Sequence, residues 1–268
     1  MTDYNKISKE IRKKILKMKY ESQEGHLGSA LSCADILNAL YSKILNIDPK
    51  NPSDENRDRF VLSKGHAVAA LYAVLAQRDF FEEKMLDEYC KDGSKLAGHS
   101  TKGSVPGLEV STGALGHGLP MATGMALTGK MDKKNYKVFV LISDGECDEG
   151  TTWESALFSA HHKLDNLTVL IDYNKWQAFG RTKDVLNLEP LAKKWESFGW
   201  QAKEIDGHNF SEIEEVLSGV PFEPGKPSVV VCHTIKGKGI PVLEDTLESH
   251  YIKLTEEDYK KALTELDA

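Results

Sequence analysis

The sequence predicts an α/β fold in which helices cover both faces of a parallel sheet. Short apolar runs rich in β-branched residues alternate with segments of helical periodicity along the chain, and no internal repeat interrupts them. Two such runs, residues 138–142 and 167–171, are separated by enough residues for one crossover helix. We therefore expect a single domain, residues 1–268, in which the carboxyl ends of the strands share one edge.

The first third of the chain predicts helices and a short strand around a glycine-containing loop. Residues 5–21 place four apolar side chains on one helical face: Ile7, Ile11, Ile15 and Met18. The basic residues around the rest of this helix are predicted to be solvated: Lys6, Lys9, Arg12, Lys13, Lys14 and Lys17. We then expect a loop over 24–29, a helix over 34–45, a strand over 59–62 and a helix over 67–77 that His66 heads.

The later elements continue this alternation after a long irregular segment. Residues 92–118 are rich in glycine, and irregular loops of such length are usually functional. We expect a helix over 119–131, followed by the crossover unit, whose helix ends at His161 and His162. A helix over 188–197 and a strand over 201–205 should follow. A helix capped by Ser211, with Glu214 at its third position, then precedes a strand over 228–231. A lysine and glycine loop over 233–239 follows, in which residues 236–239 either reach a phosphate or form a solvated turn. A last helix covers 255–266.

Composition and charge exclude several classes of function. Acidic and basic residues are interspersed, with a net charge of −7 and a pI of about 5.8, so we expect no surface for nucleic acid or for a membrane. The four cysteines lie far apart without zinc-binding spacing, as in proteins of a reducing cytoplasm. The longest apolar run, residues 67–76, is too short to span a bilayer. We therefore expect a soluble, cytoplasmic protein.

Polar residues at the ends of two neighbouring strands predict a site for a metal and a diphosphate. Asp144-Gly145 follows the first strand and Asn174 follows the second, so both should face the same edge of the sheet. Mg²⁺ takes about six oxygen ligands and shares them with phosphates. Asp144, Asn174 and a carbonyl of Lys175 or Trp176 would supply three of these ligands. The alternative is that Asp144-Gly145 and Asn174 only end strands, because these residue types tolerate turns.

Other nucleotide-binding motifs do not fit the sequence. Gly237-Lys238-Gly239 lacks the spacing and the hydroxyl of a Walker loop. Gly116-His117-Gly118 is followed by Leu119-Pro120-Met121, where a dinucleotide-binding fingerprint needs its third glycine. The sequence therefore disfavours an ATPase and an NAD-dependent enzyme.

Taken together, the polar segments resemble the thiamine-diphosphate motif, and nearly the whole chain resembles the amino-terminal half of transketolase. Besides residues 143–180, the resemblance rests on four segments: Gly25-His26, residues 62–67, Gly98-His99 and residues 106–118. Each segment is weak evidence alone, but all of them in this order are specific. The resemblance implies a thiamine-diphosphate-binding fold, and within it the diphosphate-binding (PP-type) domain.

The resemblance implies thiamine diphosphate as the cofactor, bound through Mg²⁺ or Ca²⁺. The metal ligands that it implies are Asp144, Asn174 and the carbonyl of Trp176. The cofactor-binding residues that it implies are His66, Gly113, Ala114, Leu115, Asp144, Gly145, Glu146, Asn174, Trp176 and His250. Among them, Gly145, His66 and His250 would contact the diphosphate, whereas residues 113–115 would pack along the rings of the cofactor.

The resemblance also implies catalytic roles for His26, His66, His99, His250 and Glu149. His26, His66 and His99 would line the channel of the donor sugar, where histidine suits proton transfer because it titrates near neutrality. Glu149 would belong to a proton-linking network between paired active sites.

Three residues depart from the pattern of the family. Ser143 stands where the motif usually opens with glycine, and we expect an ordinary β conformation for it. His117 replaces a frequent glutamine, and Tyr251 follows His250 where glycine is common. We expect the changes at Ser143 and Tyr251 to leave cofactor binding intact and to affect substrate contacts.

In the family, the glutamate that activates the cofactor lies in a second domain, as do the arginines that bind the sugar phosphate. The resemblance therefore implies a carboxy-terminal partner subunit that supplies this glutamate, in a heterotetramer. The implied reaction moves a two-carbon ketol unit from a ketose or ketose phosphate to an aldose, either in the pentose-phosphate pathway or in a route for modified sugars. Two alternatives stay open: a decarboxylating ligase or 2-oxoacid dehydrogenase component with the same cofactor, and a non-catalytic diphosphate-binding subunit.

Overall fold

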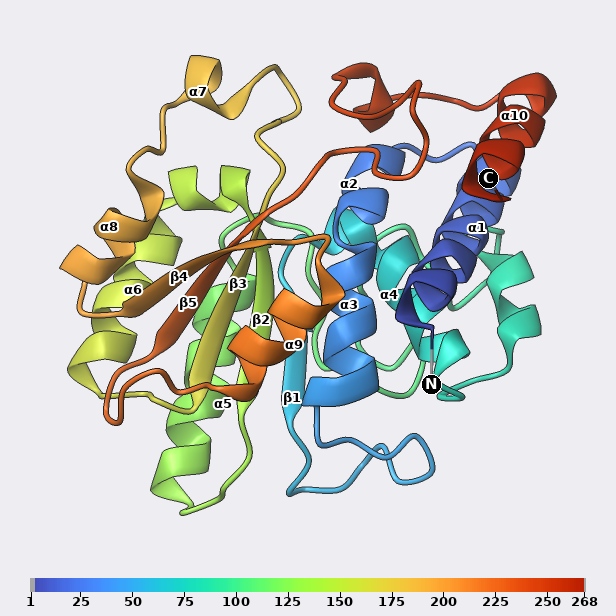
Figure 1. Cartoon of the computed structure of the whole chain (residues 1–268). Helices are drawn as coiled ribbons and strands as arrows, with labels where there is room; N and C mark the ends of the chain where they lie inside the picture. The colour runs from blue at the N-terminus through green and yellow to red at the C-terminus, as the bar shows by residue number, and fades with distance from the viewer. Residues whose placement is uncertain (1–2, 268) are drawn as a thin grey trace.

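The computed structural model, which describes residues 3–267, is built around one five-stranded sheet (Figure 1). The strand pairs are parallel, and the order across the sheet is β1-β2-β3-β5-β4. The strands are β1 (Arg59–Leu62), β2 (Val138–Ser143), β3 (Leu167–Tyr173), β4 (Gln201–Asp206) and β5 (Ser228–His233). This architecture confirms the predicted α/β class.

Helices and irregular segments connect the strands. The bounds of the helices are α1 (Tyr4–Ser22), α2 (Leu27–Ser32), α3 (Ala34–Ala39), α4 (Val68–Gln77), α5 (Gly118–Met131), α6 (Gly150–His161), α7 (Thr182–Val185), α8 (Leu191–Ser197), α9 (Phe210–Ser218) and α10 (Glu256–Asp267). A π-helical turn, Leu40–Ile44, continues α3, and residues 144–148 form a 3-10 turn after β2. None of the described helices is long and apolar enough to cross a membrane.

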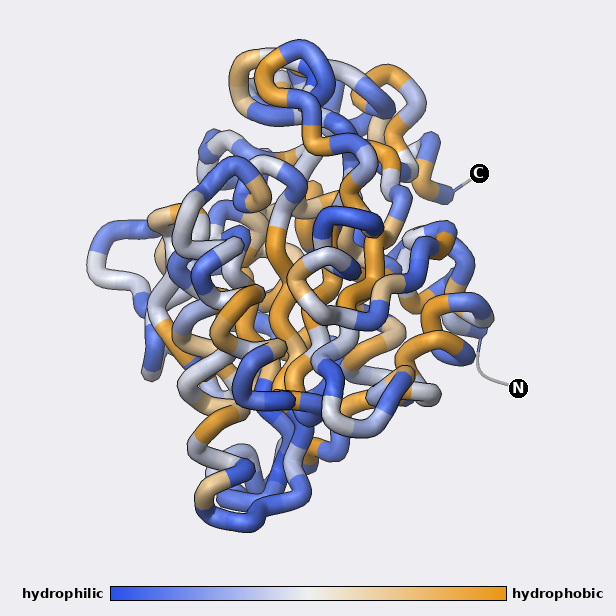
Figure 2. The backbone as a smooth tube through the Cα atoms, turned by 90° about the vertical axis from the view of Figure 1, so that its left-hand side faces the viewer, coloured by the Kyte–Doolittle hydropathy of each residue, from blue (hydrophilic) through white to orange (hydrophobic). Residues whose placement is uncertain are grey.

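Alternate residues of the strands face two separate apolar cores. In β2, Phe139 and Leu141 pack in the core that includes α1–α4, α9 and α10. Val138, Val140 and Ile142 pack in the core that includes α5, α6 and α8. Figure 1 shows these groups of helices on opposite sides of the sheet, and Figure 2 shows the strands as the apolar centre of the molecule. β2 and β3 are buried along their whole length, which explains why most of their residues are apolar.

The first helix differs from its prediction at one basic residue. Ile11, Ile15 and Met18 are buried as predicted. Arg12, however, is only 5% exposed, and it forms an ion pair with Asp35 of α3. The assignment of Arg12 to a solvated face is therefore wrong, because a buried carboxylate from a distant segment compensates its charge.

Among the predicted boundaries that differ from the structure, two have a clear physical reason. α2 begins at Leu27, inside the segment predicted as a loop, and all of its residues are buried, so packing outweighs the poor helix propensity of its glycine. The cap of α9 is Asn209 rather than Ser211, because the Asn209 side chain accepts a hydrogen bond from the Glu212 amide at 3.3 Å. Adjacent polar residues of the capping type make this choice ambiguous in sequence.

Candidate active site

A cavity of about 370 Å³ opens beyond the carboxyl ends of β2 and β3. The predicted site residues that line it are His26, His66, His99, Gly113, Leu115, Asp144, Gly145, Glu149, Asn174, Trp176 and His250. Glu149 lies at an exposed position just before α6. The cavity therefore lies at the edge of the sheet where open α/β folds bind ligands.

One wall of this cavity, which we call the metal wall, consists of Asp144, Asn174 and Trp176. Ser143 pairs with Asp172 between β2 and β3, so the residues that follow each strand emerge side by side. The Lys175 amide donates to Asp144 Oδ2 at 3.0 Å, and the Trp176 amide donates to Asn174 Oδ1 at 3.1 Å. Asp144 and Asn174 thus lie together, as the order of strands predicts.

The metal wall has the donor set of a hard divalent cation. Burial raises the pKa of Asp144 to about 7, although a hydrogen bond from the Thr182 hydroxyl at 2.7 Å opposes this shift. A cation beside this carboxylate would favour its charged form. The carboxylate, the amide oxygen of Asn174 and the Trp176 carbonyl are all oxygen donors. Within residues 3–267, no group of three or more His, Cys, Asp and Glu side chains is placed to hold a metal ion. A cation shared with an anionic ligand needs fewer protein ligands, and the three oxygen donors of the metal wall fit such a cation.

A buried ion pair supports the metal wall from inside the protein. Lys64 donates to Asp172, and neither side chain is exposed. Burial opposes both charges, but their mutual attraction outweighs it, so the pKa of Lys64 is raised and the pKa of Asp172 is lowered. Asp172 also accepts hydrogen bonds from the hydroxyls of Ser32 and Thr234 and, at 3.3 Å, from Asn174 Nδ2. The last bond directs the amide nitrogen of Asn174 toward Asp172 and leaves its oxygen on the other side.

Another part of the cavity lining, which we call the histidine wall, consists of His26, His66, His99 and His250. The ring centroid of His26 lies 5.2 Å from that of His66, 5.9 Å from that of His99 and 4.8 Å from that of His250. His26 has a left-handed backbone with φ 67°, and its amide donates to the His250 carbonyl at 2.7 Å. Such a conformation costs a non-glycine residue about 1–3 kcal/mol and is concentrated at functional sites.

Two members of the histidine wall are neutral at physiological pH. Burial, followed by the charge of Lys64, lowers the pKa of His66 well below its ordinary value. Burial, followed by the charge of Lys236, lowers the pKa of His250 to about 3. A neutral imidazole offers one N–H donor and one acceptor. His66 uses Nε2 for a hydrogen bond of 2.9 Å with the Ser29 hydroxyl.

A buried ammonium group lies beside the cavity. Lys236 lines the cavity and is 1% exposed, and within residues 3–267 its Nζ has no hydrogen-bond partner. Burial lowers the pKa of Lys236 to about 8, although the charge of Asp144 opposes the shift. A buried charge without a partner is costly, so this position suits an anionic ligand. Of the two interpretations of residues 236–239, the structure favours the one in which this segment reaches the site, through Lys236.

The structure adds residues that the sequence does not single out. Ser29, Asp148, Gln177 and Phe179 also line the cavity. Ser29 follows His26 by one helical turn, and recognising α2 as a helix would have identified it. Gln177 Nε2 donates to Asp148 Oδ2 at 2.7 Å, a contact between distant segments that leaves no signal in sequence spacing.

Two predicted cofactor-binding residues do not line the cavity. Ala114 lies at an exposed position between Gly113 and Leu115. Glu146 is fully buried, and its carboxylate accepts hydrogen bonds from the Ser63 hydroxyl, the Gly116 amide at 3.0 Å and the Ser143 amide at 2.9 Å. The carboxylate of Glu146 therefore joins three segments of the chain, and the contact of Glu146 with the cofactor stays a prediction.

Three residues depart from the family pattern. Ser143 lines the cavity, whereas His117 and Tyr251 do not. Ser143 has the expected extended conformation with φ −90° and forms a capping box with Glu146. His117 is exposed, and Tyr251 donates its hydroxyl to the Ala178 carbonyl at 2.8 Å. His161 and His162 lie at the carboxyl end of α6, as predicted, and away from the cavity lining.

Comparison with known proteins identifies close relatives of this chain. Residues 4–267 match the family model described as transketolase, thiamine diphosphate binding domain. The chain is 41% identical over 259 residues to one of the subunits of the apulose-4-phosphate transketolase of Phocaeicola vulgatus, and the match covers 97% of this chain and 92% of that protein. It is 44% identical over 243 residues to the 6-deoxy-6-sulfo-D-fructose transketolase subunit SqwG of a Clostridium species, and this match covers 91% of this chain and 88% of that protein.

Solved structures show the same architecture within longer chains. The transketolase of Campylobacter jejuni superposes with a TM-score of 0.93 at 30% sequence identity. The match covers 100% of this chain but only 43% of that one. This chain therefore spans most of the two subunits named above, but less than half of the solved transketolase.

Proposed function

The chain belongs to the transketolase family through its thiamine-diphosphate-binding domain, and from this premise we propose that it is the amino-terminal subunit of a two-chain transketolase. The observation that supports the proposal most strongly is one cavity that joins an oxygen donor set, a buried ammonium and a group of histidines. In this proposal, residues 1–268 form a single PP-type domain. The subunit contributes to the transfer of a two-carbon ketol unit from a ketose or ketose phosphate to an aldose.

The metal wall would hold the diphosphate end of the cofactor. Asp144, Asn174 and the carbonyl of Trp176 would bind Mg²⁺ or Ca²⁺, because the cavity presents their oxygens together. Lys236 would bind a phosphate oxygen with its otherwise unpartnered ammonium. When it is bound, thiamine diphosphate supplies the carbanion chemistry of ketol transfer, and the protein supplies binding and orientation.

The backbone and the neutral histidines would complete this contact. Gly145 follows Asp144 directly in the turn after β2, so its position suits a contact with the diphosphate. His66 and His250 would donate N–H groups to anionic or hydroxyl oxygens without adding charge, because the pKa of each is lowered. Gly113 and Leu115 line the same cavity and would pack against the rings of the cofactor.

The remaining histidines would act on the sugar. His26 and His99 line the cavity beside His66, where they would orient donor hydroxyls and move protons. Glu149 lies at an exposed position where α6 begins, so a proton-linking role for it would require a second subunit. This polyol-binding arrangement favours ketol transfer over the decarboxylation of 2-oxoacids.

A partner subunit would complete the enzyme. The relatives with similar length are named as subunits, whereas the solved transketolase is a chain of which this one covers 43%. We place the activating glutamate and the sugar-phosphate-binding arginines on a carboxy-terminal partner, in a heterotetramer. One relative is named for apulose 4-phosphate and another for 6-deoxy-6-sulfo-D-fructose, so we propose a pentose phosphate or a modified ketose as donor.

Reconstitution tests this function directly. The chain would be combined with a carboxy-terminal transketolase subunit, thiamine diphosphate and Mg²⁺, and ketol transfer would be measured over a panel of ketoses and aldoses. We expect transfer by the pair and only background transfer by the chain alone. Substantial transfer by the chain alone would refute the two-chain proposal, and decarboxylation of 2-oxoacids without ketol transfer would refute the reaction.

A further inference from the structure

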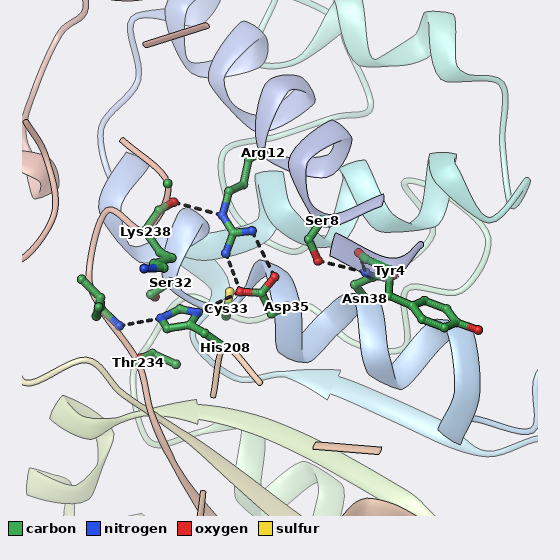
Figure 3. Close-up of polar contacts among 12 residues, drawn as sticks. Tyr4, Ser8, Arg12, Ser32, Cys33, Asp35, Asn38, His208, Thr234 and Lys238 are labelled. Carbon is green, nitrogen blue, oxygen red and sulfur yellow. Dashed lines mark hydrogen bonds and ion pairs between the residues drawn. The ribbon is translucent and has the colours of Figure 1, made fainter. Parts of the chain in front are cut away.

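A second buried ion pair lies away from the cavity lining and joins distant segments of the chain (Figure 3). Arg12 Nη1 and Nη2 donate to the two carboxylate oxygens of Asp35 at 3.0 and 2.6 Å. The exposed fractions of the two side chains are only 7% and 11%. A bidentate pair of this kind restricts both side chains to one geometry. Arg12 and Asp35 therefore form a rigid group between α1 and α3.

A histidine extends this group, and its hydrogen bonds define its protonation. The Ile235 amide donates to His208 Nε2 at 2.8 Å, so this nitrogen carries no proton. The imidazole proton is then on Nδ1, which lies 2.8 Å from Asp35 Oδ2 and donates to it. Although burial opposes ionisation, the charge of Arg12 and the hydrogen bond from His208 hold the pKa of Asp35 well below its usual range. Asp35 thus orients Arg12 and His208 at once.

Both of these side chains bind the backbone of the segment that carries Lys236. Arg12 Nε donates to the Lys238 carbonyl at 3.0 Å, and His208 accepts from the Ile235 amide. The two bonds fall on either side of Lys236 in the sequence. Close approach requires glycine here, because a Cβ on Gly239, which has φ +96°, would lie 2.9 Å from Arg12 Cδ.

Lys236 needs such support because its own side chain has none. Its ammonium has no hydrogen-bond partner within the described part of the chain, so no polar contact at Nζ fixes its direction. Immobilising a lysine side chain is entropically costly, which makes an anchored backbone valuable. Two backbone bonds also hold this segment, from the Gly237 amide to the Gly28 carbonyl at 3.0 Å and from the Asp245 amide to the Lys236 carbonyl at 2.8 Å. Loss of the side-chain bonds should therefore loosen the segment without releasing it fully.

We propose that Arg12, Asp35 and His208 are positioning residues that keep Lys236 in the cofactor cavity. The inference rests on the proposed function in one respect, because that function assigns Lys236 to the diphosphate. Its structural part, the placement of Lys236, is independent of any ligand and is tested separately.

The placement of Lys236 is tested by its reactivity. The full chain would be treated with an amine-acetylating reagent, and the rate at Lys236 would be followed by mass spectrometry. In Asp35→Asn and Arg12→Lys we expect acetylation about tenfold faster than in the wild-type chain, because local opening exposes a side chain that is otherwise 1% exposed. Arg12→Lys keeps a positive charge beside Asp35 but cannot make both the bidentate pair and the bond to Lys238.

Arg57→Met is the matched control for this experiment. Arg57 forms an equally buried pair with Glu109, with exposed side-chain fractions of 11% and 10%, and its Nε also donates to a backbone carbonyl, that of Pro52. Neither residue of this pair lines the cavity. We expect Arg57→Met to lower thermal stability but to leave the acetylation rate of Lys236 unchanged. The inference would be overturned if the acetylation rate of Lys236 were unchanged in both Asp35→Asn and Arg12→Lys. It would also be overturned if Arg57→Met raised this rate equally, and neither outcome depends on which cofactor the protein binds.

The link to the cofactor is tested by a double-mutant cycle. Binding of magnesium pyrophosphate and of thiamine diphosphate with Mg²⁺ would be measured by calorimetry on variants whose circular dichroism is native. We expect Lys236→Met to weaken binding about ten- to hundredfold, as for one charge-assisted hydrogen bond, and Arg12→Lys to weaken it about three- to tenfold.

The pattern of the cycle separates the two proposals. Added to Lys236→Met, Arg12→Lys should weaken binding no further, because its effect passes through Lys236. Independent, additive losses would overturn the positioning role while leaving the proposed function standing. Failure of the wild-type chain to bind either ligand, both alone and together with the carboxy-terminal partner subunit, would overturn the proposed function and the assignment of Lys236 to a diphosphate. The acetylation rates would still decide the placement of Lys236.

Discussion

The metal wall comes from one stretch of chain, whereas the histidine wall is assembled from four. Asp144, Asn174 and Trp176 all belong to the unit formed by β2, α6 and β3, whose strands pair in register from Val138 to Ser143. The histidines come from the start of α2, the turn after β1, the irregular segment before α5 and the turn before α10. The first wall is positioned by sheet topology and the second by packing between distant segments.

This difference implies different kinds of support. The buried pair of Lys64 and Asp172 supports the metal wall, because Asp172 accepts a hydrogen bond from Asn174. The histidine wall depends on backbone contacts such as the bond from the His26 amide to the His250 carbonyl. We therefore expect changes in the metal wall to affect cofactor binding and stability, and changes in the histidine wall to affect the sugar.

Asp144→Ala should have the largest effect on activity. Loss of a residue that only supports a metal ligand typically lowers activity about 10–100-fold. Asp144→Ala removes a metal-binding carboxylate itself, so ketol transfer by the reconstituted two-chain enzyme should fall by clearly more than this. Asp184→Ala, a change at an exposed position of α7, is the control and should retain activity. Turnover at the wild-type rate in Asp144→Ala would refute the metal wall.

Lys64→Met tests the support of that wall. It leaves Asp172 buried without its partner, which should lower the free energy of unfolding by about 3–5 kcal/mol. Urea unfolding followed by circular dichroism measures this change. Lys17→Met is the control, because Lys17 pairs with Asp87 at the surface and its loss should cost at most about 1 kcal/mol. Equal losses in the two variants would contradict the structural role of Lys64.

His26→Ala tests the division between the two walls. Removal of a proton-transfer group should lower kcat/KM for the donor sugar by about 10²-fold. The Kd of thiamine diphosphate should change less than about threefold, because His26 is assigned to the sugar. Steady-state kinetics and calorimetry on the same preparation give both numbers. A large loss of cofactor affinity with an unchanged response to the donor would reverse the assignment.

Tyr251→Phe should have the smallest effect. The hydroxyl of Tyr251 binds the Ala178 carbonyl, but its side chain is 57% exposed. We expect a change in stability within about 0.5 kcal/mol and unchanged cofactor binding. A marked loss of donor use in this variant would show that the rim of the cavity, and not only its walls, selects the sugar.

The contrast between the walls also explains how far the sequence could predict this molecule. The strands, their parallel orientation and the meeting of Asp144 with Asn174 follow from apolar runs and from the handedness of crossovers. Nothing in spacing brings His26 and His250 together, and only the resemblance to a family placed both at one site.

The polar side chains that the sequence misplaces or leaves undecided share a physical cause, because the groups that surround each of them lie far away in sequence. Arg12 looks like a solvated residue until Asp35 is placed beside it. Glu146 stands beside Asp144 in the sequence, but its buried carboxylate accepts hydrogen bonds from distant donors such as Ser63. Lys236 could be read either way, because its burial depends on packing that local patterns do not encode.

The most direct test of the cofactor anchor is a crystal structure of this chain grown with Mg²⁺ and thiamine diphosphate. We predict the metal on Asp144 and Asn174, and the diphosphate in contact with Lys236 in the same cavity. A diphosphate held elsewhere, or a metal bound without Asp144, would contradict the central claim that the ends of β2 and β3 form the cofactor anchor.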